Sequence, residues 1–268
     1  MKLKNSDLTF IDLFAGCGGL SLGLEKAGFI PLYVNEINKD ALETYLINRD
    51  QDFPYLREKF NSHDIKEIIT KDKFFNNLFK EFKKSFGRDF KKNNIDLVVG
   101  GPPCQGYSGI GVRRSYSVDK IQLPSNHLYQ DMAFFIHSIK PKMFMFENVR
   151  GLLNSRWTSK GIKGEIFKDV LNTFKKIPNY NVTYKLVHAK DYGVPQNRPR
   201  VLIIGILKDI FETSFDDSLD AGLLPKPKHD YPDLVDVLSD LVDKKFKYGE
   251  STNKYPNDPK SKWQKEIR

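Results

Sequence analysis

The chain has 268 residues, of which 40% are hydrophobic and 29% charged, a balance that excludes a disordered or fibrous protein. No apolar run reaches membrane-spanning length and no signal peptide precedes the first strand-like segment, so we expect a cytoplasmic protein without a membrane partner. The net charge of +9 favours a polyanionic partner, although a solvated lysine-rich surface over residues 71–92 and 244–265 explains it equally well.

Short apolar segments alternate with helical patterns over the first 207 residues, which predicts an α/β fold with a doubly wound, mostly parallel sheet. We expect strands at 9–14, 31–35, 95–100, 142–146, 183–188 and 200–207, and helices at 20–27, 39–48, 127–139 and 164–175. Residues 74–92 are expected to form a helix and a surface connection. Beyond residue 207 the pattern loosens, which predicts a main domain, 1–207, and an extension, 208–268, with a short helix near 234–241.

The first expected strand ends in a glycine-rich turn, Ala15-Gly16-Cys17-Gly18-Gly19, and a helix follows. Glycines let the backbone turn tightly and approach a ligand closely, and the helix N-terminus offers free N–H groups to an anionic moiety. Such a turn usually holds a nucleotide-like ligand, but alone it is a weak signal. The dinucleotide fingerprint has a third glycine where Ser21 stands, which disfavours NAD.

Two acidic residues end later segments at the same expected edge of the sheet. Glu36 follows the second strand, where a carboxylate can accept hydrogen bonds from ribose hydroxyls, and Asp64 ends a short segment, where it can accept from an adenine amino group. Together with the glycine turn they predict an adenosine pocket. For either acid alone, a helix N-cap or an exposed loop carboxylate is an equally good interpretation.

Cysteine occurs only at positions 17 and 104, which excludes a disulfide framework and a zinc-binding thiolate cluster, so we expect no metal. Cys104 follows Gly100-Gly101-Pro102-Pro103 at the end of a strand. A lone cysteine is usually a buried structural residue, but a cysteine in a turn of prolines and glycines packs little core. We therefore predict a nucleophile at Cys104, with a positive field or a helix N-terminus that favours its thiolate.

Glu147 comes directly after four apolar residues, 143–146, at the expected end of a strand. Partial desolvation there favours the protonated acid, which can donate a proton near neutral pH, whereas a surface glutamate that caps the next turn is the alternative. Farther on, Gln196, Arg198 and Arg200 face one side if this stretch is extended. Such paired arginines bind an anion or a carbonyl, and a phosphate or the protein's own carboxylates are alternatives.

Five motifs in one order resemble those of the DNA cytosine-5 methyltransferase family. They are DLFAGCGG (12–19), NE (35–36), GGPPCQGYS (100–108), FENVRGLL (146–153) and DYGVPQNRPRVLIIG (191–205). The resemblance implies that residues 1–207 form a Rossmann-like catalytic domain that binds S-adenosylmethionine. Enzymes that modify exocyclic amino groups on the related fold carry an aromatic residue where this chain has Cys104.

The resemblance also implies a role for each site residue. Cys104 would attack C6 of a cytosine flipped out of double-stranded DNA, while Glu147 holds and protonates N3, so that C5 can accept the methyl group. Arg200 would bind O2 of the base, and Arg198 would position Cys104 or a phosphate. Further substrate contacts are expected at Gln105, Ser108 and Gln196, in part on a mobile loop over residues 105–126. The expected cofactor contacts are Phe14, Ala15, Gly16, Cys17, Gly18, Gly19, Leu20, Glu36, Ile37, Asp64, Ile65, Pro103 and Leu128.

The sequence departs from the family in two ways. Ile37 replaces an aromatic residue, which implies weaker stacking on adenine, and the target-recognition region with its two closing motifs is missing. We expect either half of a split enzyme, whose second subunit supplies recognition, or a truncated remnant that binds DNA or regulates without catalysis. The first is favoured because the chemical residues are kept and because the extension has apolar positions that suit a partner, Leu234, Val235, Val237, Leu238 and Leu241. RNA cytosine methylation is a further alternative, and a restriction-modification system is the commonest setting of the family.

Overall fold

The computed structural model describes residues 2–103, 127–210, 224–227, 232–243, 245–247 and 254–268. These residues belong to two compact units. The first comprises Met1–Lys185 and Val201–Ala221, and the second comprises Leu186–Arg200 and Gly222–Arg268. The domain boundary predicted at residue 207 stays a prediction.

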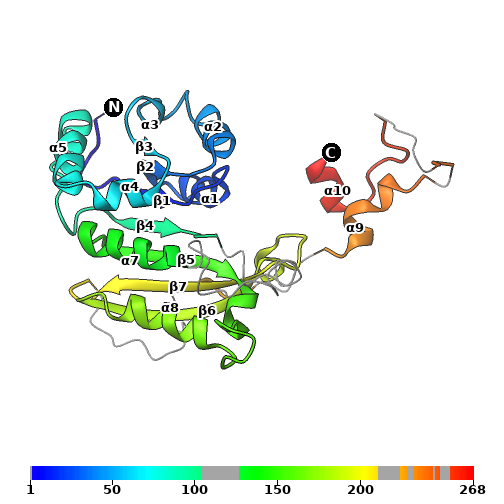
Figure 1. The fold of residues 1–268 in the computed structure, drawn as a ribbon. Helices are drawn as coiled ribbons and strands as arrows, with labels where there is room; N and C mark the ends of the chain where they lie inside the picture. The colour runs from blue at the N-terminus through cyan, green and yellow to red at the C-terminus, as the bar shows by residue number, and fades with distance from the viewer. Residues whose placement is uncertain (1, 104–126, 211–223, 228–231, 244, 248–253) are drawn as a thin grey trace. The chain divides into compact units, whose positions relative to one another are not determined.

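A seven-stranded sheet in the order β3-β2-β1-β4-β5-β7-β6 is the framework of the fold (Figure 1). The strands are β1 (Thr9–Leu13), β2 (Ile30–Asn35), β3 (Asn61–Ser62), β4 (Leu97–Gly100), β5 (Met143–Val149), β6 (Tyr180–His188) and β7 (Pro199–Leu207). β1 to β5 pair in parallel, whereas β7 is reversed, because the Leu207 N–H at its end donates to the Lys142 carbonyl just before β5. The predicted doubly wound, mostly parallel sheet is confirmed.

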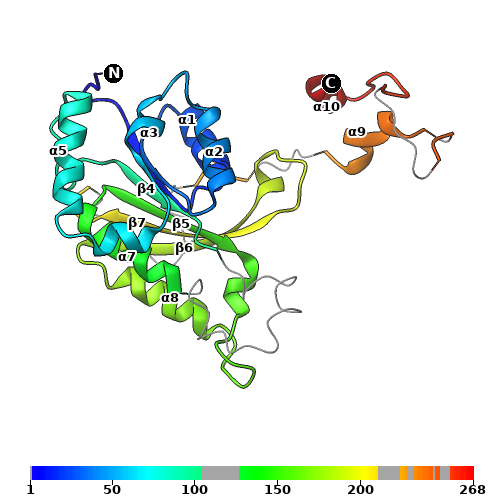
Figure 2. The ribbon, with the colours of Figure 1, turned by 45° about the horizontal axis from the view of Figure 1, so that its top comes forward.

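Helices cover both faces of the sheet (Figure 2). α1 (Gly19–Lys26) packs Leu20 and Leu24 against a core cluster of Phe10, Leu97 and Val99 on one face. On the other face, the buried residues of α7 (Leu128–Ile139) and α8 (Glu165–Lys175) meet the alternate side chains of β4 and β5. The remaining helices of the first unit are α2 (Lys39–Ile47), α3 (Tyr55–Glu58), α4 (Ile65–Thr70), α5 (Phe74–Phe86) and the 3-10 helix η3 (Arg150–Asn154).

The second unit contains η4 (Ala189–Tyr192), α9 (Leu234–Leu238), η5 (Ser239–Leu241) and α10 (Lys262–Ile267). Polar contacts hold the last three helices together: the Arg268 guanidinium pairs with the buried carboxylate of Asp240 at 2.8 Å, and buried Gln264 donates to Ser239 Oγ at 2.8 Å. Of the apolar positions expected to suit a partner, Val237 is buried, and the others, Leu234, Val235, Leu238 and Leu241, are exposed.

None of the helices among the described residues has the length and apolar content that crossing a membrane requires.

Candidate active site

The register of the sheet aligns the last residues of β1 and β4 with Phe146, which lies inside β5. Leu13, the last residue of β1, is paired with Gly100, the last residue of β4, and Gly100 is paired with Phe146 of β5. Neighbouring strands lie about 4.8 Å apart, so the segments that leave these three positions start within about 10 Å of one another. Those segments are the glycine turn, the Gly-Pro-Pro turn before Cys104, and Glu147. This is also where the strand order reverses, which is the usual ligand crevice of such sheets.

The glycine turn has open space on one side. Phe14, Gly16 and Gly18 have positive φ angles of 58°, 55° and 87°, which reverse the chain between β1 and α1. A Cβ atom built on Gly16 or on Gly19 would meet no other atom within 4 Å. The backbone therefore leaves room at these two positions for a ligand to approach closely.

A buried polar network supports the opposite side of the turn. A Cβ atom on Gly18 would lie 2.6 Å from the Tyr45 ring and 2.7 Å from the Arg49 guanidinium, so only glycine fits there. Arg49 is 4% exposed, donates to the Gly18 carbonyl at 3.1 Å and pairs with Glu25 at 2.6 Å. Its guanidinium also lies 3.9 Å above the centre of the Tyr45 ring. Arg49 was not expected from the sequence, because a single arginine in a helical segment gives no local signal of such a role.

The same network reaches the first strand. Tyr45 Oη lies 2.9 Å from Ser21 Oγ, and Ser21 Oγ donates to the Asp12 carboxylate at 2.5 Å. Burial raises the pKa of Asp12 to about 7, although the hydrogen bond from Ser21 and the charge of Arg49 oppose this shift. The position at which the dinucleotide fingerprint has its third glycine is thus occupied by a buried serine that links α1 to β1.

Glu36 follows β2 directly, as predicted, and its carboxylate is tied to the glycine turn. Oε2 accepts from the Gly16 N–H and Oε1 from the Asn38 N–H, both at 2.8 Å, and the residue is 9% exposed. The next side chain, Ile37, is apolar and 65% exposed. A carboxylate beside an open glycine turn and an uncovered apolar side chain fit the ribose and adenine of an adenosine moiety.

Asp64 is the N-cap of α4, since its Oδ1 accepts from the Lys66 N–H at 2.9 Å. The N-cap interpretation is therefore confirmed, and a cofactor contact at Asp64 stays a prediction. Burial, together with the nearby charge of Asp64, raises the pKa of Asp131 in the first turn of α7, while Lys66 opposes this. Asp64 therefore lies near the start of α7. Leu128, the first residue of that helix, is half-buried.

Glu147 lies against the turn that leads to Cys104. A Cβ atom built on Gly101 would be 2.9 Å from Glu147 Oε2, and the Asn148 side chain donates to the Pro102 carbonyl at 3.1 Å. Asn148 is buried, and no pattern in the sequence indicated this contact. Pro103 is exposed, whereas Cys104, Gln105 and Ser108 lie outside the described residues.

The expectation that the strand ends at Phe146 is wrong, because β5 continues to Val149 and includes Glu147. β4 ends at Gly100, opposite Phe146, so the chain turns away there and the side chain of Glu147 faces that turn. The apolar run predicted the end of the strand three residues too early, because Glu147 and Asn148 have strand geometry although they are polar.

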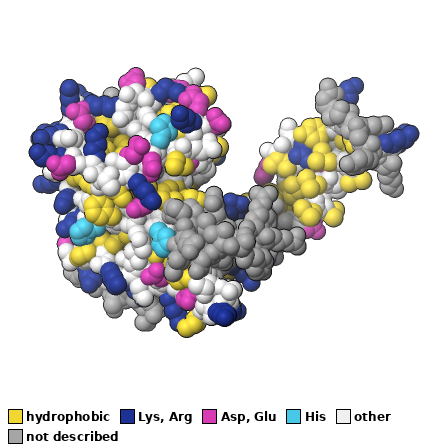
Figure 3. All heavy atoms as spheres, in the orientation of Figure 1, with side chains coloured by type: hydrophobic (Ala, Val, Ile, Leu, Met, Phe, Trp, Pro, Cys, Tyr) yellow, Lys and Arg dark blue, Asp and Glu magenta, His cyan; other side chains and the backbone are white. Residues whose placement is uncertain are grey.

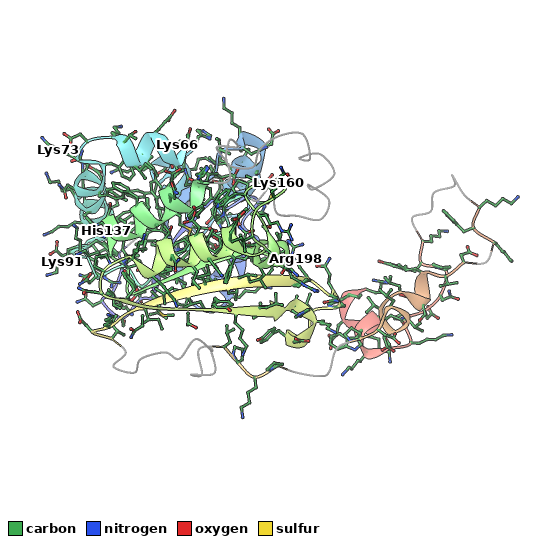
Figure 4. The ribbon with its side chains drawn as sticks, turned by 60° about the horizontal axis from the view of Figure 1, so that its bottom comes forward. Lys66, Lys73, Lys91, His137, Lys160 and Arg198 are labelled. Carbon is green, nitrogen blue, oxygen red and sulfur yellow. The ribbon has the colours of Figure 1, made fainter. Side chains whose placement is uncertain are left out.

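The arginines belong to the second unit, in Leu186–Arg200. Arg198 is exposed (Figure 4), and Arg200 is half-buried near the start of β7. The assumption that the chain is extended from Gln196 is wrong, since the Gln196 N–H donates to the Val194 carbonyl at 2.7 Å and the Arg198 N–H to the Gln196 carbonyl at 3.0 Å. These tight turns bend the chain before Pro199, where β7 begins, so period-two alternation does not relate Gln196 to the arginines.

In the part of the chain that the structure describes, no three His, Cys, Asp or Glu side chains gather in a way that could hold a metal ion.

The sequence profile of one family, described as C-5 cytosine-specific DNA methylase, matches residues 8–267. The chain belongs to this family. Its predicted membership is confirmed.

Two curated relatives are type II methyltransferases. M.FnuDI of Fusobacterium nucleatum is 35% identical over 209 residues, which cover 78% of this chain and 50% of the relative. M.DdeI of Desulfomicrobium norvegicum is 31% identical over 267 residues, 97% of this chain and 55% of the relative. The chain thus spans about half the length of the curated relatives it matches.

A solved structure has the same fold. It is the crystal structure of an E. coli prophage protein described as a DNA modification methyltransferase, with a TM-score of 0.59 and 28% identity. The match covers 88% of this chain and 56% of that chain. The predicted Rossmann-like methyltransferase fold is therefore confirmed.

Proposed function

We propose that this chain carries the catalytic half of a DNA cytosine-5 methyltransferase, which transfers a methyl group from S-adenosylmethionine to C5 of cytosine in double-stranded DNA. One observation carries the proposal: the register aligns Leu13, Gly100 and Phe146, so the glycine turn, the turn before Cys104, and Glu147 follow from neighbouring positions in the sheet. Acceptor and donor of a methyl group must meet in such a confined space. Membership of the C-5 cytosine-specific family supports the choice of reaction.

S-adenosylmethionine supplies an electrophilic methyl group on a sulfonium. In our proposal Glu36 accepts hydrogen bonds from its ribose, Ile37 covers one face of its adenine, and the open side of Gly16 and Gly19 admits the rest. The other predicted cofactor contacts remain part of this proposal. No metal takes part in the proposal.

The chemical steps fall to the chain's own side chains. The Cys104 thiolate forms a bond to C6 of a flipped-out cytosine, while Glu147 donates a hydrogen bond or a proton at N3 and so limits the charge on the ring. The electron pair at C5 would then bond to the methyl carbon while the bond between that carbon and the sulfonium sulfur breaks, with its electron pair left on sulfur. Removal of the C5 proton expels Cys104 and restores the aromatic ring. In this scheme Arg200 binds the O2 atom of the cytosine, and Arg198 positions Cys104 or a phosphate. Further contacts with the DNA come from Gln105, Ser108 and Gln196.

The experiment uses duplex DNA with 5-fluorocytosine, whose fluorine cannot leave as a proton does. We expect a covalent complex that resists denaturation and that requires S-adenosylmethionine. Cys104→Ala should abolish the complex, whereas the control variant Lys26→Ala, at the exposed end of α1, should still form it. The proposal would be wrong if no adduct formed in either of two assays: one with the chain alone, and one with an added polypeptide that corresponds to the relatives' other half. An adduct with RNA but not DNA would favour the RNA alternative.

We further propose that a complementing subunit supplies target recognition, as part of a restriction-modification system. The exposed apolar side chains of α9 and η5 support a contact with such a subunit, and the type II relatives support the setting. The alternative is a chain that binds DNA without catalysis. Strong DNA binding without any 5-fluorocytosine adduct would distinguish that alternative. The cytoplasmic location stays a prediction.

A further inference from the structure

A lysine-rich surface lies at the edge of the sheet opposite the active site. It is formed where β4, β5 and β6 begin and where β7 ends, by residues 2–4, 83–94, 140–142, 175–179 and 208, all in the first unit. We call this surface the basic edge. Its lysines are Lys2, Lys4, Lys83, Lys84, Lys91, Lys92, Lys140, Lys142, Lys175, Lys176 and Lys208.

Backbone hydrogen bonds join these segments into one continuous surface. In order along the edge, they are Leu3 N–H to Phe86 O at 3.0 Å, Asn93 N–H to Lys140 O at 2.9 Å, Leu207 N–H to Lys142 O at 3.0 Å, and Lys208 N–H to Asn179 O at 2.9 Å. Arg88 strengthens the first junction, since its guanidinium donates to the carbonyls of Asp7 and Asn94 at 2.9 and 3.2 Å. Backbone hydrogen bonds therefore link the lysine-bearing segments to one another.

The charge of this surface is mainly positive, although Asp7 and the exposed Asp209 border its segments. Asp89 is the only acidic residue in the five segments, and it pairs with Lys83 at 3.0 Å, while Asp96 of the adjoining strand start pairs with Lys142 at 2.6 Å. Figure 3 shows lysine and arginine side chains gathered at the left, where α5 ends. Around the cofactor turn the balance is reversed, because acidic residues outnumber basic ones over residues 36–58. A uniformly solvated lysine-rich surface would not divide in this way.

We propose that the basic edge binds the phosphates of a second segment of duplex DNA, without reading its sequence. The edge spans four strand-to-strand steps from β1 to β6, roughly 19 Å at about 4.8 Å each, over which a duplex presents a negative charge about every 1.7 Å. Lysine ammonium groups act as point charges that contact phosphates but do not specify bases. The choice of DNA as the polyanion rests on the proposed function.

The bound segment must differ from the one that is methylated. Glu147 follows Lys142 by five residues, so about 17 Å of strand separates the basic edge from the proposed active site. A straight duplex cannot lie along both ends at once. Contact at the basic edge would hold the protein on DNA while the other edge samples bases of a different segment.

The test measures how the affinity for a short non-specific duplex depends on salt, by fluorescence anisotropy. The variant of the basic edge carries Lys83→Gln, Lys84→Gln, Lys91→Gln and Lys92→Gln. Each lost phosphate contact reduces the slope of log K against log salt by about 0.9, so four contacts reduce it by about 3.6. The matched control removes four exposed lysines elsewhere in the first unit, Lys26→Gln, Lys71→Gln, Lys73→Gln and Lys168→Gln, and should leave the slope nearly unchanged.

An unchanged slope in the edge variant, or equal changes in both variants, would overturn the proposal. Thermal melts of both variants confirm that each remains folded. The 5-fluorocytosine adduct separates this proposal from the proposed function, because Cys104→Ala should lose the adduct and keep the full salt slope. A chain that forms no adduct but shows the predicted difference between the two lysine variants would contradict the proposed function alone.

Discussion

Single buried residues set the shape of the glycine turn. Arg49 contributes most of these contacts, because one guanidinium binds the Gly18 carbonyl, the Tyr45 carbonyl and the Glu25 carboxylate. A buried ion pair is costly to break, since the remaining partner keeps its desolvation penalty without its counterion. The turn that we propose as the cofactor site therefore depends on a residue outside every recognised motif.

Arg49→Met should lower the free energy of unfolding by about 3–5 kcal/mol, as expected when one partner of a buried pair is removed. The matched control is Arg57→Met: Arg57 pairs with Asp50 and Glu43, but these side chains are all more than a third exposed, so a loss of about 1 kcal/mol or less is expected. Urea unfolding of both variants gives the comparison. Similar losses at the two positions would contradict the importance of the buried network.

Asp12 should make stability depend on pH. Its pKa is raised from 3.8 to about 7 in the fold, so the folded state holds the proton more tightly than the unfolded state. The resulting stabilisation is complete below pH 3.8 and is lost as the pH rises through 7. The charged or titratable groups that act on Asp12 are Arg49, Glu25, Glu36 and Tyr45.

In Asp12→Asn this pH dependence should disappear, because asparagine keeps an acceptor for Ser21 but does not titrate. The unfolding free energy of the wild type, measured relative to the variant in urea at pH 5, 6, 7 and 8, should fall steadily. Asp40→Asn, on the exposed start of α2, is the control and should track the wild type. A constant difference between wild type and Asp12→Asn would show that the carboxyl is ionised throughout.

At the scale of elements, α1 has two glycines that differ in what lies beside them. A Cβ atom meets nothing within 4 Å at either Gly19 or Gly23, so alanine fits the fold at both. Only Gly19 starts the helix next to the open side of the glycine turn, whereas Gly23 lies inside the helix. The pair can therefore separate helix stability from ligand binding.

Gly23→Ala should stabilise the protein by up to about 1 kcal/mol and leave the affinity for S-adenosylmethionine unchanged. Gly19→Ala should leave stability equal or higher, but it should weaken binding at least tenfold, because the new methyl group enters the space proposed for the cofactor. Calorimetric titration and thermal melts measure the two effects. Equal affinities in the two variants would place the cofactor elsewhere.

The regular elements with strong apolar patterns were predictable from the sequence. All six expected strands are present. The four helices whose bounds were predicted from the sequence agree with α1, α2, α7 and α8 to within one residue at each end. β3 has two residues, too few to show alternation, and α3 and α4 are too short for a helical period. α10 was missed because polar contacts through Gln264 and Arg268 replace an apolar face.

The candidate site was predictable only where a motif marked it. Glu36 and Glu147 each follow an apolar strand run, which marks them in the sequence, although Glu147 itself lies inside β5. Asn148 and Arg49 act through contacts with residues 31 to 46 positions away, which no local pattern records. The bends around Gln196 were missed because they depend on backbone hydrogen bonds that the order of residues does not show.

At the scale of the whole molecule, positive charge gathers along one end of the first unit, and the proposed chemistry lies at the other end. The chain spans about half of each curated relative, and the complete activity therefore stays part of our proposal. The proposed roles of the basic edge and of the active edge are separable, because they use different residues of one rigid sheet.

Each of the two units contains one tryptophan, which can serve as its own fluorophore. The chain has two tryptophans, Trp157 in the first unit and Trp263 in the second. Variants that keep one indole each would report the melting of one unit at a time through its emission wavelength. Excitation energy transfer to a dye on the DNA would then reveal which unit approaches the duplex first.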